Sequence, residues 1–152
     1  MEVKDIVKEA VTISEEASFK DAVQAMISGQ TNTLLVIDAD GTLSGEVSVS
    51  DLLDAIVPDY LDGDNIAAHF ATEEMFEEAA KDATDKQIKF FMSQDFSAVH
   101  MDDGLMAVAA TAIGHQRARI PVVDADGRPL GIISRRGLKH IIAQTLDIED
   151  SA

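Results

Sequence analysis

Ser48 and Asp51 combine residue types and spacing that allow specific chemistry, because a hydroxyl and a carboxylate stand three positions apart. A carboxylate only accepts hydrogen bonds and can hold both hydroxyls of a ribose diol. A serine at the start of a helix lies beside backbone N–H groups that favour phosphate. The same spacing is typical of a helix capping box, which needs no ligand. The two interpretations are compatible, and the sequence leaves both open.

Arginine is confined to one part of the chain, since all five arginines lie between Arg117 and Arg136 in a protein of net charge −16. Guanidinium groups match the geometry of phosphate, so this cluster is the candidate for binding an anion. The acidic surface elsewhere repels nucleic acid and anionic lipid, and neither is expected as a partner. Pairing of the arginines with acids of the first half, or of another subunit, is the alternative.

Other chemistry is not expected. A zinc set is excluded because there is no cysteine and no two histidines are three or four positions apart; the histidines are His69, His100, His115 and His140. The two Asp-x-Asp-Gly segments lack the oxygen ligand that a calcium loop requires two positions earlier, where Val36 and Val122 stand. Glycine-rich phosphate loops and nucleophile elbows are also missing from the sequence, so we expect no catalytic residues and no enzyme.

The elements that must position these residues occur twice. Asp-Ala-Asp-Gly stands at 38–41 and again at 124–127, and a shift of 86 positions also aligns Val36 with Val122, Gly45 with Gly131 and Ser48 with Ser134. A repeat fixes the architecture before any local prediction is made. Because a half of about 60 residues is marginal alone, we expect the two halves to share one core.

Each half predicts the order β-α-β-β-α. In the first half, a short strand at Thr12-Ile13 is followed by an amphipathic helix that Ser18 and Asp21 cap, and then by strands at 34–37 and 43–48 and a final helix. The second half repeats this from Ala98-Val99, with strands at 120–123 and 130–134. The Asp-Ala-Asp-Gly segments suit tight turns in which glycine adopts positive φ.

Residues 58–87 are predicted to be an inserted acidic helical connector between repeat 1 (1–57) and repeat 2 (88–146), and residues 147–152 a flexible tail. Thr72 indicates a helix start, and Thr84 with Gln87 resembles a capping box. The acids at 73–78 indicate a solvated helix face, with a docking surface for a basic partner as the alternative.

The two copies resemble a tandem of cystathionine-β-synthase (CBS) domains. The resemblance covers nearly the whole chain and is best from Ile120-Pro121-Val122-Val123-Asp124 through Gly131-Ile132-Ile133-Ser134. It implies an α+β fold in which two β-α-β-β-α repeats pack pseudo-symmetrically through their sheets. It also implies clefts between the repeats that bind AMP, ADP, ATP or S-adenosylmethionine, with no other cofactor.

The family's nucleotide signature is Gly-apolar-apolar-Ser/Thr-x-x-Asp. The first repeat keeps Gly45, Ser48 and Asp51 but departs at Glu46, and the second has Gly137 where the ribose aspartate belongs. We therefore expect Ser48 and Asp51 to form the stronger site, since the missing aspartate weakens an otherwise equal site by about tenfold or more. By position, its further contacts are Thr12, Ile13, Thr33 and Leu34. The weaker site is expected to be lined by Val99, Arg119, Ile120, Ser134, Arg135 and Arg136.

Because the sequence has no window of 18 consecutive apolar residues and no secretory pattern, we expect a cytoplasmic protein without a membrane partner. The resemblance implies a stand-alone homodimer that signals nucleotide occupancy to an unidentified regulated protein. The alternative is a protein-interaction or structural module with vestigial clefts. We also hypothesise that the arginines bind the phosphates of a ligand held mainly by the first repeat. Undiminished ATP affinity after Arg135→Ala and Arg136→Ala would reject that hypothesis.

Overall fold

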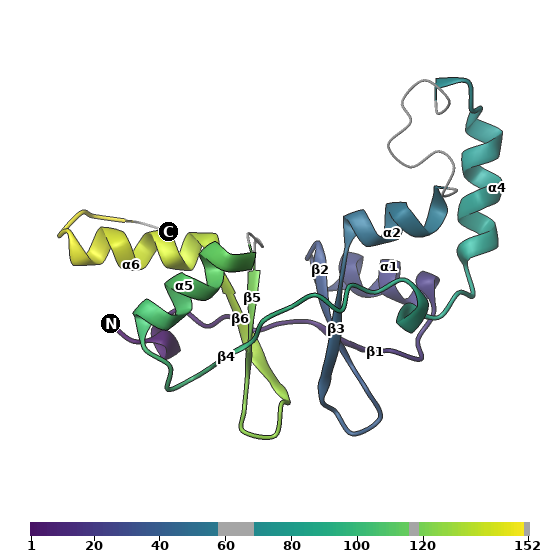
Figure 1. Cartoon of the computed structure of the whole chain (residues 1–152). Helices are drawn as coiled ribbons and strands as arrows, with labels where there is room; N and C mark the ends of the chain where they lie inside the picture. Colours follow the sequence, from purple (N-terminus) through teal and green to yellow (C-terminus); the bar gives the residue numbers. More distant parts are fainter. Residues whose placement is uncertain (58–68, 116–118, 151–152) are drawn as a thin grey trace. The chain divides into compact units, whose positions relative to one another are not determined.

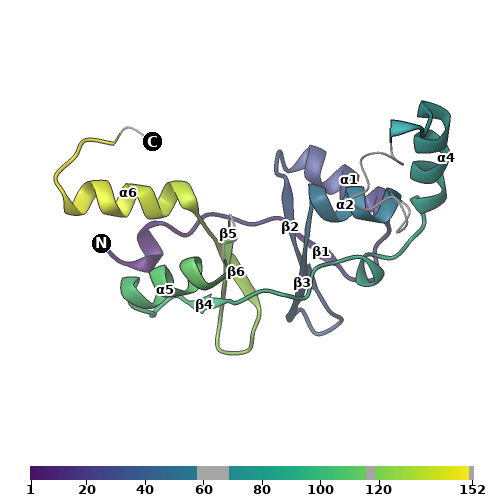
Figure 2. The ribbon, with the colours of Figure 1, turned by 45° about the horizontal axis from the view of Figure 1, so that its top comes forward.

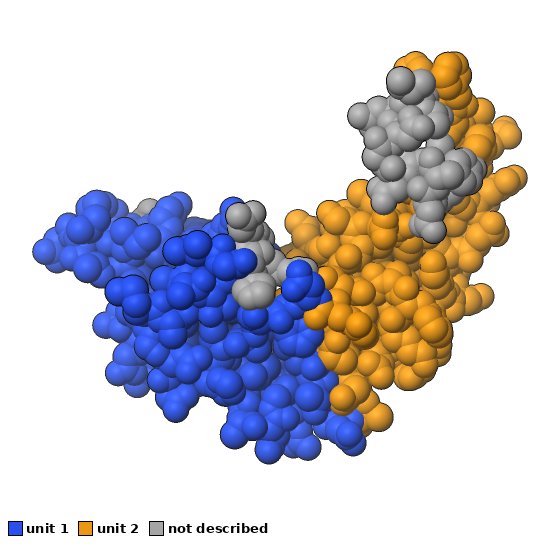
Figure 3. All heavy atoms as spheres, viewed as in Figure 1, with its two compact units in different colours: residues 1–10, 40–43, 95–152 blue, residues 11–39, 44–94 orange. Residues whose placement is uncertain are grey.

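The computed structural model describes residues 1–57, 69–115 and 119–150 (Figure 1). The first part of the predicted connector, the cluster member Arg117 and the last two residues of the predicted tail lie outside these ranges. The chain divides into two compact units, which are described one at a time (Figure 3). Unit 1 comprises residues 1–10, 40–43 and 95–152, and unit 2 comprises residues 11–39 and 44–94.

Unit 2 holds the first set of elements. In chain order these are β1 (Thr12–Ser14), α1 (Phe19–Ser28), β2 (Thr33–Ile37), most of β3 (Leu43–Ser48), α2 (Val49–Ile56), α4 (Glu73–Ala83) and the 3-10 helix η3 (Ile88–Phe90). The sheet has the order β1-β2-β3, with β1 parallel to β2 and Ile13 opposite Val36. Figure 2 shows α1 and α2 side by side. The charge at Glu46 does not expose β3, because Glu46 itself is only 5% exposed.

Unit 1 holds the second set. Its elements are the 3-10 helix η1 (Val3–Asp5), β4 (Val99–His100), α5 (Leu105–His115), β5 (Arg119–Val123), β6 (Pro129–Ser134) and α6 (Arg135–Thr145). β4 is parallel to β5, and β5 is antiparallel to β6. The predicted order β-α-β-β-α is therefore confirmed in both halves. Within the described ranges, no helix combines the length and the apolar character needed to cross a membrane.

The turns between the paired strands have the predicted geometry. Gly41 and Gly127 adopt φ values of 81° and 82°, a region that side chains with a Cβ rarely occupy. Asp124 closes the second turn, because its Oδ1 accepts hydrogen bonds from the N–H groups of Asp126 and Arg128, each at 2.9 Å. The two aspartate-glycine segments are turns, as expected from their sequence.

Two of the three predicted caps are confirmed. Ser18 and Asp21 bond each other's N–H groups at the start of α1, and Thr72 Oγ1 accepts from Met75 N at 3.2 Å at the start of α4. The capping box predicted at Thr84 and Gln87 is wrong. Thr84 instead ends α4, where its hydroxyl donates to the carbonyl of Lys81 at 2.6 Å. A threonine between two helical segments can donate to a carbonyl at the end of the first helix or accept from an N–H at the start of the next. The sequence is the same in both cases.

Most buried apolar side chains of the described residues form two clusters, one in each unit, and not the single core that was expected. Each cluster is completed by a segment from the other half of the sequence. Val3 and Ile6 join the core of unit 1 with Val122 and Ile133. Ile88, with no exposed surface, joins Leu34 in the core of unit 2. Burial of each such side chain stabilises the fold by about 1.5–3 kcal/mol, which ties the two halves to one another.

Candidate functional site

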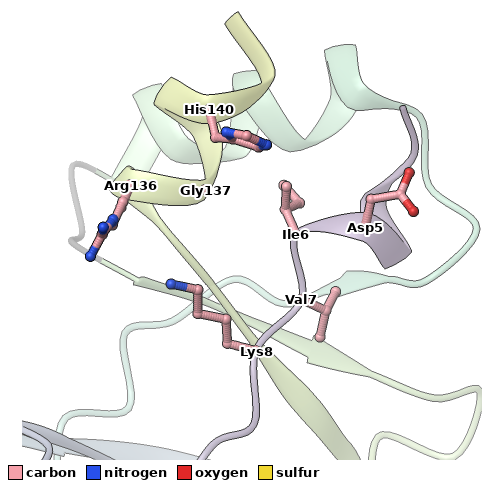
Figure 4. Close-up of a pocket in the computed structure, with 7 residues that line it drawn as sticks. All are labelled: Asp5, Ile6, Val7, Lys8, Arg136, Gly137 and His140. Atoms are coloured by element: carbon pink, nitrogen blue, oxygen red, sulfur yellow. The ribbon is translucent and has the colours of Figure 1, made fainter. Parts of the chain in front are cut away.

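A hollow of about 220 Å³ in unit 1 lies between the N-terminal segment and the start of α6 (Figure 4). The N-terminal segment supplies both apolar and charged groups, and α6 supplies a helix N-terminus with basic side chains. The lining residues are Asp5, Ile6, Val7, Lys8, Arg136, Gly137 and His140. The hollow therefore combines apolar walls with polar groups, as small-molecule sites do.

The hollow depends on a close approach between the N-terminal segment and β6. Lys8 and Ile132 exchange two backbone hydrogen bonds, with N···O distances of 2.8 and 2.9 Å. Only glycine fits at the neighbouring position on β6. A Cβ on Gly131 would lie 2.6 Å from Val7 Cγ1 and closer still to the carbonyl oxygen of Lys8. The backbone pairing thus fixes where the side chains of Val7 and Lys8 enter the hollow.

The start of α6 presents positive charge to this hollow. Ser134 is the N-cap, and its Oγ accepts a hydrogen bond from Gly137 N at 3.2 Å. The N-terminal end of a helix carries a partial positive charge. Lys8 and Arg136 add two full charges, and among the described residues neither side chain forms an ion pair. Figure 4 shows both side chains extending to the same side of the hollow.

The other two polar side chains of the hollow have partners. The carboxylate of Asp5 accepts a hydrogen bond from Glu2 N at 2.7 Å, within the capping box of η1. Nδ1 of His140 lies 3.1 Å from Oδ2 of Asp150. Lys8 and Arg136 therefore outnumber the one lining acid, Asp5, and this favours an anionic group.

Unit 2 repeats the same framework around Ser48. Ser48 is the N-cap of α2, and Ser93 exchanges two backbone hydrogen bonds with Glu46 on β3, with N···O distances of 2.8 and 2.9 Å. A Cβ on Gly45 would lie 2.7 Å from Met92 Sδ and 2.9 Å from the carbonyl oxygen of Ser93. Met92 and Ser93 therefore correspond to Val7 and Lys8 of unit 1.

The number of positions that separates equivalent residues of the two repeats is not constant. It changes between the segments that precede β1 and β4 and these strands themselves. β1 and β4 are related by 86 positions, because Ile13 pairs with Val36 and Val99 with Val122. Ser93 corresponds to Lys8 with a shift of 85, and η3 is likewise 85 positions after η1. One additional residue therefore precedes β4, and a search with a constant shift does not align the segments that complete the two sites.

The comparison with protein families settles the classification. The model of the CBS domain matches residues 3–58 and 86–144. The chain belongs to the CBS domain family. The matched ranges include the N-terminal segment and the start of α6, so the CBS match covers every residue of the hollow.

Known CBS proteins share its fold over most of its length. A CBS domain-containing protein of unknown function from Kribbella flavida has a TM-score of 0.78 at 18% identity, over 94% of this chain and 99% of that one. The CBS domain pair of protein MJ0100, solved in complex with 5′-methylthioadenosine and S-adenosyl-L-methionine, has a TM-score of 0.67 at 21% identity, over 93% and 99% of the two chains.

Two curated proteins align with most of this chain. An uncharacterized protein of Methanocaldococcus jannaschii is 26% identical over 149 residues, which are 91% of this chain and 89% of that protein. A homoserine O-acetyltransferase of Methanocorpusculum labreanum is 25% identical over 127 residues. This chain spans only 21% of that second protein, so its activity does not transfer to the CBS chain.

Among the residues predicted for the stronger site, Ser48 and Asp51 come together. Asp51 Oδ2 lies 2.8 Å from Ser48 N and 3.1 Å from Ser48 Oγ, so the capping alternative is confirmed for this pair. Leu34 is part of the core of unit 2, with no exposed surface. The remaining three, on β1 and β2, are half-buried at Ile13 and Thr33 and exposed at Thr12.

Among the residues predicted for the weaker site, only Arg136 lines the hollow of unit 1. Val99 and Ile120 belong to the core of that unit, and their side chains pack against its other apolar groups. Ser134 acts beside the hollow as the cap of α6, and Arg119 lies opposite it on β5. Arg135 is exposed at the first position of α6.

Five lining residues were not predicted from the sequence: Asp5, Ile6, Val7, Lys8 and His140. A signal for the N-terminal segment was present, because Val3, Ile6 and Val7 repeat the apolar spacing of Ile88, Phe91 and Met92. An alignment with a constant shift of 86 does not detect this similarity, because these two segments are related by a shift of 85. The prediction for Gly137 concerned only the carboxylate that it lacks, although Gly137 lines the hollow.

Proposed function

We propose that this chain binds adenosine compounds such as AMP, ADP, ATP or S-adenosylmethionine, and that occupancy regulates a partner protein. The observation that carries the proposal is the hollow of unit 1, where the N-terminal segment meets the start of α6. The bound 5′-methylthioadenosine and S-adenosyl-L-methionine of the structurally similar MJ0100 pair support this class of ligand. Cytoplasmic location and a homodimer stay predictions from the sequence.

The hollow also suggests how binding leads to regulation. Lys8 belongs to the predicted repeat 1 and Arg136 to the predicted repeat 2, although both lie in unit 1. A ligand that contacts both side chains stabilises the arrangement in which they are close. Because a ligand shifts an equilibrium only by its difference in affinity between two states, regulation requires a second arrangement with weaker binding.

Ser48 and Asp51 support a second binding position in unit 2. A carboxylate at the start of a helix can accept hydrogen bonds from the two ribose hydroxyls of an adenosine compound. Met92 and Ser93 supply the counterpart of the N-terminal segment there. We propose that this position binds the adenosine group more tightly than the hollow of unit 1, where Gly137 offers no carboxylate.

Isothermal titration calorimetry of the full chain with AMP, ADP, ATP and S-adenosylmethionine tests the function. Saturable heat with a sub-millimolar dissociation constant for any of them supports a nucleotide sensor. Silence for all four rejects it and favours the interaction module. Conversion of any of these compounds by the pure protein, followed by chromatography, would instead indicate an enzyme.

A further inference from the structure

The hollow of unit 1 and the position around Ser48 and Asp51 in unit 2 differ in charge. Each basic side chain of the hollow has a neutral or acidic residue as its equivalent in unit 2. Equivalent residues follow from the shared framework, with a shift of 85 in the segments that lead to β1 and β4 and of 86 in α2 and α6. Lys8, Arg136 and His140 of unit 1 correspond to Ser93, Ser50 and Asp54 of unit 2. Gly137 corresponds to Asp51.

In unit 1 two cations and one carboxylate line the cavity. Lys8 and Arg136 form no ion pair among the described residues, and they outnumber the lining acid, Asp5, which accepts a hydrogen bond from Glu2 N at 2.7 Å. The first N–H groups of α6 add positive potential at the same place. Phosphate oxygens are strong acceptors for guanidinium, ammonium and helix N–H groups.

In unit 2 the equivalent position is acidic. Asp51 and Asp54 lie on the first two turns of α2, and neither Ser50 nor Ser93 carries a charge. The lysine of η3, Lys89, pairs with Glu16 at 3.0 Å and so is engaged elsewhere. A phosphate placed here would meet carboxylates without a compensating cation, whereas a neutral or cationic adenosine compound would not be repelled.

We propose that the hollow of unit 1 selects adenosine ligands that carry phosphates, such as ATP, and that the equivalent position of unit 2 selects adenosine ligands without them. This rests on the proposed function and divides its ligands between the two positions. The hollow's 220 Å³ is below the about 300–1,000 Å³ of a typical small-molecule pocket. It therefore encloses part of the ligand and leaves the phosphates at its rim, beside Lys8 and Arg136.

Calorimetry with matched ligands and variants tests this division on the full chain. ATP and 5′-methylthioadenosine share the adenosine group and differ in phosphate charge. The variant combines Lys8→Gln and Arg136→Gln. The control is Lys4→Gln, which removes a lysine of η1 from the same N-terminal segment; Lys4 pairs with Glu2 at 3.2 Å and does not line the hollow. Thermal unfolding of each variant establishes that it is folded.

The double variant is expected to bind ATP at least about tenfold more weakly for each cation removed, since a hydrogen bond to a charged group is lost in each case. Its affinity for 5′-methylthioadenosine, and the ATP affinity of Lys4→Gln, are expected to stay unchanged. Unchanged ATP affinity in the double variant, or an equal loss for both ligands, overturns the division while the proposed function stands.

Calorimetry with inorganic tripolyphosphate distinguishes failure of the proposed function from failure of the phosphate site in unit 1. If no adenosine compound binds the natural chain, the proposed function fails. Binding of tripolyphosphate that the double variant loses then still supports a phosphate site in unit 1. Silence with tripolyphosphate as well rejects both ideas.

Discussion

Asp51 and Ser48 bond each other in both directions at the start of α2, with Asp51 Oδ2 2.8 Å from Ser48 N and Asp51 N 3.3 Å from Ser48 Oγ. The pair is thus a capping box whatever ligand binds beside it. Any loss of binding after its mutation must be separated from loss of the helix cap. The chain contains a suitable control, because Ser18 and Asp21 make the same pair of bonds on α1.

Asp51→Asn and Asp21→Asn are expected to destabilise the fold slightly and by similar amounts, because each weakens one capping box. Only Asp51→Asn is expected to weaken adenosine binding, by about tenfold or more, through its loss of a charged acceptor. Urea unfolding and calorimetry measure the two effects. Equal loss of binding in both variants would show that Asp51 acts through stability alone.

Gly137→Asp is expected to stabilise the protein by about 1 kcal/mol. A side chain fits, because a Cβ on Gly137 would lie 3.4 Å from Ile6 Cβ and 3.5 Å from the carbonyl oxygen of Ile6. The aspartate would complete a capping box with Ser134, and replacing a helical glycine adds a further gain. Gly137→Ala gives the propensity gain without the cap. An aspartate variant no more stable than the alanine variant in urea unfolding would contradict the prediction.

Gly131→Ala is expected to be strongly destabilising, by about 1–3 kcal/mol or more, because the new Cβ would meet the carbonyl oxygen of Lys8. Gly45→Ala should cost less, since its nearest contact is the flexible side chain of Met92, at 2.7 Å, and the carbonyl oxygen of Ser93 lies farther away, at 2.9 Å. Gly114→Ala is the control, as a Cβ on Gly114 would have no heavy atom within 4 Å. Chemical unfolding ranks the three. Equal stability of the Gly131 and Gly114 variants would refute the close approach.

The ionisation of Asp21 is expected to make the stability of the fold depend on pH in the acid range. The backbone N–H of Ser18, and next its hydroxyl, hold the pKa of Asp21 below its ordinary value. A carboxylate with a lowered folded-state pKa stabilises the fold above its unfolded-state pKa, and this stability is lost as pH falls through the folded-state value. The stability difference between the natural chain and Asp21→Asn is therefore expected to be constant near neutral pH and to shrink below about pH 4.

Urea unfolding at a series of pH values measures this difference. A difference that grows on acidification would have the wrong sign for a lowered pKa. A difference that stays constant to about pH 2 would show that the Asp21 carboxylate is not stabilised by Ser18 in the folded chain.

Local patterns in the sequence were sufficient for most of the fold. The turn glycines at 41 and 127, the cap of α1 and the order of helices and strands each depend on residues a few positions apart, so the printed sequence contains their cause. Thr84 is the exception that shows the limit. Its hydroxyl can satisfy a carbonyl before it or an N–H after it, and the neighbouring sequence is compatible with both.

The sequence by itself determined that the chain is a duplicated α+β unit of the CBS family with serine-capped helices at Ser48 and Ser134. Only the tertiary structure showed that Lys8 lies beside Arg136 and Gly137, 128 positions or more along the chain. The pairing of Lys8 with Ile132 brings them together. Such backbone pairing depends on which strand edge a segment reaches, and backbone N–H and C=O groups are the same in almost every residue type. The physical cause of the hollow therefore has no local signature in the sequence.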